Sequence, residues 1–190
     1  MRRKRRLFFA IGIPKAAREA LVRFSNKHKK IPVRWVPEEN FHATVLFLGP
    51  TDEGRISDLR KAAVGILRKS APRDEVRFTH IDWGPPKGPM RMIWLYGEAG
   101  HSWQRLKNTL RQTYMKRGLY RGTDEWPFLP HVTVARMELK SRRVTLPRIE
   151  TAFDTVFRPS ELLLMESHLS PRGPNHEVRD RIALPREEAA

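Results

Sequence analysis

The chain has 190 residues, a hydrophobic fraction of 39% and no cysteine, so it can bury a core but cannot form disulfides, thiolate nucleophiles or cysteine-based zinc sites. Its 37 Lys and Arg against 21 Asp and Glu give a formal net charge of +16, which favours a polyanionic partner such as nucleic acid. Its apolar runs fall short of the roughly 20 residues that a membrane-spanning helix needs. We therefore expect a cytoplasmic protein with no membrane segment.

The hydrophobic pattern predicts more strands than helices. In chain order the predicted elements are a strand at 6–13, a helix opened by Pro14, an extended piece at 34–36, a strand at 41–48, a helix over 52–69, strands at 75–83 and 90–97, a helix from about Ser102, and strands at 130–136, 152–157, 161–169 and 176–184. There is no βαβ alternation, so the fold class is α+β. No linker divides the chain, which indicates a single domain over 1–190 with a flexible basic arm (1–5) and a flexible tail (185–190).

Two of the apolar strands contain the same polar motif. "FHATVLFLG" includes His42 and Thr44, and "PHVTVAR" includes His131 and Thr133. Residues i and i+2 of a strand point to the same side, so each histidine shares a face with its threonine. Because the two copies lie about half a chain apart, each in a half with a helix and several strands, we expect two similar lobes that each present one copy.

Side-chain alternation also predicts the rest of the first motif strand. It continues the face of His42 through Leu46 and Leu48, and it puts Phe47 on the opposite face.

Two imidazoles and two hydroxyls that meet in one cleft suit the chemistry of a phosphate ester. One imidazole can take a proton from the attacking group and the other can give one to the leaving oxygen, because their ordinary pKa of about 6.5 lies near neutrality. The hydroxyls can donate hydrogen bonds to the phosphate oxygens on which charge gathers. Two core histidines with satisfied hydrogen bonds are the alternative, and the paired motifs disfavour it.

The sequence resembles the two-histidine phosphoesterases, and among them the LigT-like RNA 2′,3′-cyclic phosphodiesterases, also called 2′-5′ RNA ligases. The resemblance rests on "RLFFAI", "RWVPEENFHATVLFLG" and "PFLPHVTVAR" and extends over nearly the whole chain. It implies a bilobal fold in which two pseudo-symmetric lobes face a central cleft with antiparallel sheets and hold their helices outside.

The resemblance also implies roles for the motif residues. His42 would protonate the leaving 3′ oxygen, and His131 would act as the base that activates water. Thr44 and Thr133 would bind the phosphate, and Arg136 falls where the family often has a basic residue near it. No metal ion and no cofactor are implied, and the sequence contains neither a His-Glu helix pattern nor a Walker-type glycine loop.

Three further positions bear on substrate recognition. Trp35 and Phe41 flank the first motif and could stack an unpaired base, although core packing is the alternative for both. Near the C-terminus the family often has a Gly-x-x-Tyr element, and this chain has "GPNHEV" with His176 at the corresponding place.

The predicted function is hydrolysis of RNA 2′,3′-cyclic phosphate ends, with tRNA halves as one candidate substrate, to 2′-phosphates, together with related 2′-5′ ligation. Two alternatives stay open: a relative that acts on small cyclic phosphates, small cyclic nucleotides among them, or on 2′,5′-oligonucleotides, and a non-catalytic RNA-binding module. We expect a monomer.

Overall fold

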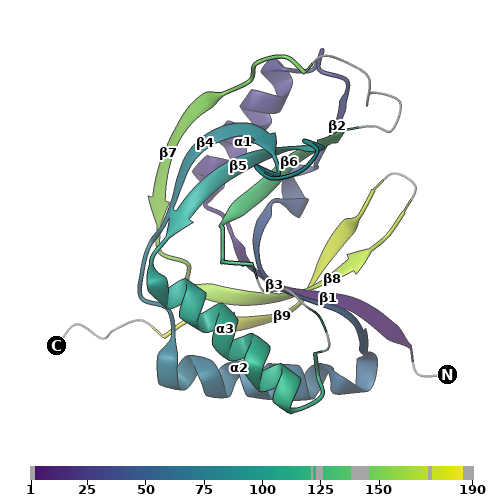
Figure 1. The fold of residues 1–190 in the computed structure, drawn as a ribbon, viewed down its shortest axis with the longest axis vertical. Helices are drawn as coiled ribbons and strands as arrows, with labels where there is room; N and C mark the ends of the chain where they lie inside the picture. Colours follow the sequence, from purple (N-terminus) through teal and green to yellow (C-terminus); the bar gives the residue numbers. More distant parts are fainter. Residues whose placement is uncertain (1–2, 121, 123–125, 138–145, 171–172, 186–190) are drawn as a thin grey trace.

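The structure is a computed structural model that describes residues 3–120, 122, 126–137, 146–170 and 173–185. Within these residues the helices and strands follow the predicted order closely (Figure 1). They are β1 (Lys4–Gly12), α1 (Lys15–Lys27), β2 (Val33–Trp35), β3 (His42–Asp52), α2 (Ile56–Ser70), β4 (Val76–Gly84), β5 (Met92–Ala99), α3 (His101–Lys116), β6 (His131–Met137), β7 (Thr151–Phe157), β8 (Glu161–His168) and β9 (Asn175–Ala183).

The strands form one antiparallel sheet in the order β7-β4-β5-β6-β3-β1-β8-β9, with β2 added beside β6. Figure 1 shows the sheet divided into an upper lobe, which contains β2 and β4–β7 with α1 outside, and a lower lobe, which contains β1, β3, β8 and β9 with α2 and α3 outside. Within the described residues, β3 and β6 connect the two lobes of the sheet through the pair Ala43 with Val132. The predicted α+β fold of two lobes with antiparallel strands and external helices is confirmed, although one sheet runs through both lobes.

Each lobe presents one motif strand, but the lobes are not the two halves of the chain. The lower lobe combines the early strands β1 and β3 with the late strands β8 and β9, whereas α1 and β2 belong to the upper lobe. The chain therefore passes between the lobes several times, which ties them together.

The buried residues of the helices recur at helical spacing. Ala17, Leu21 and Phe24 form the buried face of α1, as expected from their spacing. On α3, Tyr114 is fully buried and stacks on Phe9 of β1 with ring centroids 5.9 Å apart. The helices thus hold the outer faces of the sheet and leave the inner faces to the cleft.

A β-bulge changes the side-chain pattern of β3. Val45 has no partner on β1, while its neighbours Thr44 and Leu46 are both paired. One extra residue reverses the alternation beyond it. The prediction for this face was therefore wrong: Leu46 and Leu48 point into the main core, and Phe47 points to the side of the histidine with 54% of its surface exposed.

A second bulge has the same effect on β6. Val134 is skipped in the pairing with β5, whereas Thr133 and Ala135 are paired. The reversal moves Arg136 onto the face of His131, from which strict alternation would exclude it. The two motif strands thus share one local design, with a histidine, a threonine two residues later and a third inward side chain three residues after that.

The N-terminal arm is shorter than predicted. β1 already begins at Lys4, and the guanidinium of Arg5 lies 2.8 Å from Glu53 and 3.0 Å from Glu166. These ion pairs fix a segment that we expected to be flexible, while residues 1–2 and 186–190 lie outside the described part of the chain.

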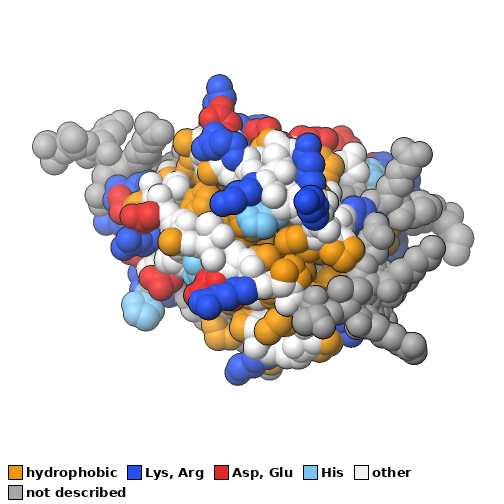
Figure 2. Space-filling view, turned by 90° about the horizontal axis from the view of Figure 1, so that it is seen from above, with side chains coloured by type: hydrophobic (Ala, Val, Ile, Leu, Met, Phe, Trp, Pro, Cys, Tyr) orange, Lys and Arg blue, Asp and Glu red, His pale blue; other side chains and the backbone are white. Residues whose placement is uncertain are grey.

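Basic side chains are widespread on the surface. In the view from above, Lys and Arg side chains surround an area that contains a histidine and apolar groups (Figure 2). No helix in the described residues is long and apolar enough to cross a membrane.

Candidate active site

The two motifs meet where the lobes join. The residues that follow the two histidines pair with each other across β3 and β6. Continued in both directions, this antiparallel register sets His42 opposite Thr133 and Thr44 opposite His131. The structure therefore brings the four predicted side chains together as a diagonal arrangement of two imidazoles and two hydroxyls.

Each imidazole is held by the backbone carbonyl two residues before it. The Nδ1 of His42 donates to the carbonyl of Asn40 at 2.7 Å, and the Nδ1 of His131 donates to the carbonyl of Leu129 at 2.9 Å. A carbonyl can only accept, so the hydrogen of the neutral ring sits on Nδ1. In both rings Nε2 is thus the nitrogen that can exchange a proton with a substrate.

His42 lies in an aromatic corner. Its ring centroid is 4.9 Å from that of Phe8 and 4.8 Å from that of His176. Burial lowers the pKa of His42 to about 4, with a further contribution from the charge of His176, while the hydrogen bond to Asn40 acts in the opposite direction. The free protein therefore holds this ring neutral at pH 7.

Asn40 connects this corner to the end of the chain. Its side chain is buried, and Oδ1 accepts a hydrogen bond of 2.9 Å from the backbone N–H of His176. Asn40 therefore positions both His42, through its carbonyl, and β9, through its side chain.

His131 is positioned by a stacked tryptophan. The rings of Trp94 and His131 are 3.8 Å apart and inclined by 23°. A β-carbon at Gly84 would lie 2.6 Å from the Trp94 ring, so only glycine leaves room for this stack. Burial lowers the pKa of His131, and the charge of Arg136 adds to the effect.

The polar groups around the imidazoles can receive an anion. The hydroxyls of Thr44 and Thr133 make no hydrogen bond within the described part of the chain, and both side chains are half-buried. Arg136 donates to the sulfur of Met92 at 3.2 Å, while its buried Nε has no partner among the described residues. Two free hydroxyls and a guanidinium are the donors that a phosphate prefers.

The two aromatic residues predicted to stack a base are packed elsewhere. Trp35 is half-buried against Phe24 of α1, with ring centroids 6.1 Å apart, and Phe41 is only 6% exposed in the main core. Sequence reasoning missed Phe47, whose exposed ring lies 5.6 Å from that of Phe8. The bulge at Val45 turns Phe47 to the face of His42, and no feature of the residue pattern predicts that bulge.

His176, the histidine of "GPNHEV", lies beside His42. Its ring meets the ring of His42 edge-on, at an interplanar angle of 83°. Burial lowers the pKa of His176 to about 4, and the charges of Arg136 and His168 act in the same direction. The cleft thus contains a third imidazole that is neutral at pH 7.

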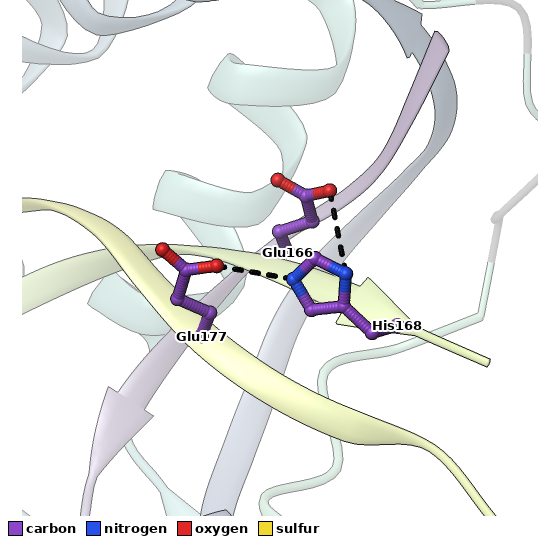
Figure 3. A group of neighbouring side chains, drawn as sticks. All are labelled: Glu166, His168 and Glu177. Atoms are coloured by element: carbon purple, nitrogen blue, oxygen red, sulfur yellow. Dashed lines mark hydrogen bonds and ion pairs between the residues drawn. The ribbon is translucent and has the colours of Figure 1, made fainter. Parts of the chain in front are cut away.

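One group of potential metal ligands lies outside the cleft. Glu166, His168 and Glu177, on β8 and β9, offer ligand atoms within 4.8 Å of one another (Figure 3). Both carboxylates are already engaged by guanidinium groups, Glu166 by Arg5 at 3.0 Å and Glu177 by Arg179 at 3.1 Å. Two adjacent positive charges would repel a cation, so the donor set fits an ion-pair network better than a metal site.

Comparison with known proteins gives consistent results. The sequence model of the family described as LigT like Phosphoesterase matches residues 11–94. A Thermus thermophilus protein named RNA 2′,3′-cyclic phosphodiesterase is 32% identical over 188 residues, which are 94% of this chain and 90% of that protein. A protein of the same name from Methanocaldococcus jannaschii is 28% identical over 177 residues, 91% of this chain and 97% of that protein.

Solved structures resemble the whole fold. A crystal structure of a Thermus thermophilus protein superposes with a TM-score of 0.78 at 27% identity and covers 94% of this chain and 97% of its own. The structure of Escherichia coli LigT complexed with 3′-AMP gives a TM-score of 0.72 at 26% identity, with 96% of this chain and 99% of that chain covered.

Proposed function

The chain belongs to the family of LigT-like phosphoesterases, and from this premise we infer that it is an RNA 2′,3′-cyclic phosphodiesterase that works by histidine acid–base catalysis. The observation that supports it best is the convergence of the two motifs, in which Nδ1 of His42 and of His131 is bonded to the backbone and the neighbouring strand places a threonine opposite each histidine. The substrate is an RNA end whose terminal ribose holds a cyclic phosphate. Action as a cytoplasmic monomer stays a prediction.

The two imidazoles divide the proton transfers of hydrolysis. His131 Nε2 takes a proton from water as the water oxygen bonds to phosphorus. His42 Nε2 gives a proton to the 3′ oxygen as its bond to phosphorus breaks, so the phosphate stays on the 2′ oxygen. In-line displacement requires attacking and leaving oxygens on opposite sides of phosphorus, which two histidines on neighbouring strands can flank. In ligation, an RNA 5′-hydroxyl would take the place of water.

Substrate binding enables His42 to take up from solvent the proton that it must donate. The pKa of His42 is about 4 in the free protein because the ring is buried. A bound phosphate brings a negative charge beside the ring and raises this pKa. Thr44, Thr133 and Arg136 then stabilise the charge that gathers on the non-bridging oxygens.

The base of the terminal nucleotide would lie against Phe47. This ring is exposed on the cleft side and is linked to His42 through Phe8, which contacts both rings. An aromatic face binds any of the four bases with little preference. Trp35 and Phe41, packed in the core, are not part of this proposal.

The pH dependence follows from the lowered pKa values. We expect kcat/KM for a cyclic mononucleotide to peak below pH 6.5, because both essential imidazoles of the free enzyme have pKa values lowered by burial. Above the peak the acid loses its proton, and below it the base gains one. The pH profile of kcat should lie at higher pH than that of kcat/KM, since a bound phosphate raises the pKa of both imidazoles. Initial rates at constant ionic strength would measure both profiles.

Arg136 offers a control for this interpretation. Its charge contributes to the lowered pKa of both His42 and His131, so Arg136→Met should move the kcat/KM profile to higher pH as well as reduce its height. A profile that loses height without moving, or a wild-type optimum above pH 7, would contradict the assignment.

The function itself is tested by a substrate panel. Purified protein should convert 2′,3′-cyclic AMP, CMP, GMP and UMP to 2′-phosphates, and phosphorus NMR against both standards identifies the product. A 3′-phosphate product would reverse the roles of His42 and His131 or the orientation of the ribose. Turnover of 2′,5′-oligonucleotides alone would favour the alternative substrate class, and no turnover at all would favour a binding module.

A further inference from the structure

A second basic surface lies outside the cleft. A groove of about 880 Å³ separates the C-terminal end of α2, the start of α3 and the turn between β7 and β8, and we call it the α2–α3 groove. Five cationic side chains line it: Arg68, Lys69, Arg73, Arg105 and Arg158. We propose that this groove binds the sugar-phosphate backbone of the substrate RNA upstream of its reacting end, an inference that rests on the proposed function.

The groove is lined by more cations than carboxylates. Its lining contains one carboxylate, Asp74, which accepts hydrogen bonds from the backbone N–H of Ser102 at 2.7 Å and from its hydroxyl at 2.6 Å. Asp74 is thus committed to the first turn of α3. No described carboxylate lies within ion-pairing distance of Arg68, Lys69 or Arg105, whereas Arg158 is paired with Glu75 at 3.9 Å. Such cations attract phosphates by releasing the counterions that RNA condenses.

The groove adjoins a cavity that reaches His42. Arg158 and Pro159 line it and also line a cavity of about 750 Å³ that His42 borders. That cavity is lined by three guanidinium groups and by three carboxylates, Glu38, Glu39 and Glu161, so its charges balance. Two of the carboxylates are paired, Glu38 with Arg18 at 3.3 Å and Glu161 with Arg181, which reduces their repulsion of a phosphate. An RNA whose terminal phosphate lies between the two histidines can therefore pass through this cavity and over Arg158 into the groove.

A cavity of about 650 Å³ on the other side of the cleft is the competing exit. Phe47 borders it, and its lining contains two cations, Lys4 and Arg55, and one carboxylate, Asp52. Arg55 is also paired with Asp58 at 3.4 Å. The charges there nearly cancel, so this cavity attracts a polyanion less than the α2–α3 groove does.

The test compares a long and a short substrate. The groove variant combines Arg68→Gln, Lys69→Gln and Arg105→Gln, all exposed positions whose replacement leaves the core intact. For a 20-nucleotide single-stranded RNA with a 2′,3′-cyclic phosphate end, we expect kcat/KM to fall by roughly 10- to 100-fold near 0.1 M salt. The slope of log affinity against log salt should become shallower by about 2, at about 0.7 per lost phosphate contact. For 2′,3′-cyclic AMP the change should stay within about twofold.

The matched control removes three charges from the outside of the upper lobe. Arg23→Gln, Lys27→Gln and Lys30→Gln are equally exposed changes on and just after α1, and they should leave both substrates nearly unaffected. Equal losses in the two triple variants would overturn the proposal in favour of a diffuse field. So would an unchanged rate on long RNA, or a larger loss when Lys4 and Arg55 are both replaced by Gln.

A binding measurement separates this proposal from the proposed function. Fluorescence anisotropy of a labelled RNA follows the groove without any turnover. Suppose that wild-type protein failed to hydrolyse 2′,3′-cyclic AMP but bound RNA more tightly than the groove variant. The catalytic function would then be contradicted, and the groove proposal would be supported. If RNA binding were the same in wild type and groove variant, the groove proposal would fall even in an active enzyme.

Discussion

Replacing either His42 or His131 by alanine is expected to lower kcat/KM for 2′,3′-cyclic nucleotides by about 10²–10⁴-fold, the usual contribution of one positioned proton-transfer group. Each ring is fixed at Nδ1 by a backbone carbonyl, so each has one nitrogen with which to act on the substrate. The double variant should lose less than the product of the two single losses, because the two transfers belong to one reaction. Steady-state rates of the three variants measure both effects.

Asparagine provides the discriminating substitution. His42→Asn can keep a donor to the Asn40 carbonyl but cannot transfer protons, so it should be as inactive as the alanine variant while retaining more of the packing against Phe8. His101→Ala, at the exposed start of α3, is the control and should be fully active. Near-normal rates in a folded His42 or His131 variant would remove the acid–base mechanism.

The sequence predicted those features that depend on composition and local period. Buried stripes at helical spacing fixed the helices, as Ala17, Leu21 and Phe24 show for α1. The His-x-Thr pairs could be recognised as one-sided because two residues of a strand share a face before any irregularity intervenes. The two motifs meet because each lies on its own strand and these strands, β3 and β6, pair with each other.

The wrong predictions concern features that depend on how a strand pairs with its neighbour. The bulge of β3 at Val45 depends on how β1 pairs with it. The residues of "ATVLF" show no local preference that would predict this bulge. The misplaced Leu46 and Leu48, and the missed Phe47, all follow from this one residue. Arg136 was assigned to the phosphate by resemblance, and the bulge at Val134 places it on the face of His131.

No local sequence pattern predicted that strands from both ends of the chain share one lobe. β1 pairs with both β3 and β8, so strands from the two ends of the chain complete the lower sheet. This topology brings His176, near the C-terminus, to the ring of His42 and to Asn40. A sequence reading by halves could not place that third imidazole in the site.

The threonine hydroxyls are the second large expected effect. Thr44→Val and Thr133→Val keep the shape that a strand favours and delete a donor to a charged phosphate oxygen, which is worth about 1.5–3 kcal/mol. Each variant should therefore lose roughly 10- to 150-fold in kcat/KM. Because charge on the phosphate grows toward the transition state, most of the loss should fall on kcat rather than on KM.

Serine separates the hydroxyl from the rest of the side chain. Thr44→Ser and Thr133→Ser retain the donor and should recover most of the lost rate, whereas a structural role for the methyl group would leave serine as impaired as valine. Thr155→Val, on the edge strand β7, is the matched control and should change the rate little. Full activity in both valine variants would show that the threonines only favour the strand, and charge stabilisation would then depend on Arg136 alone.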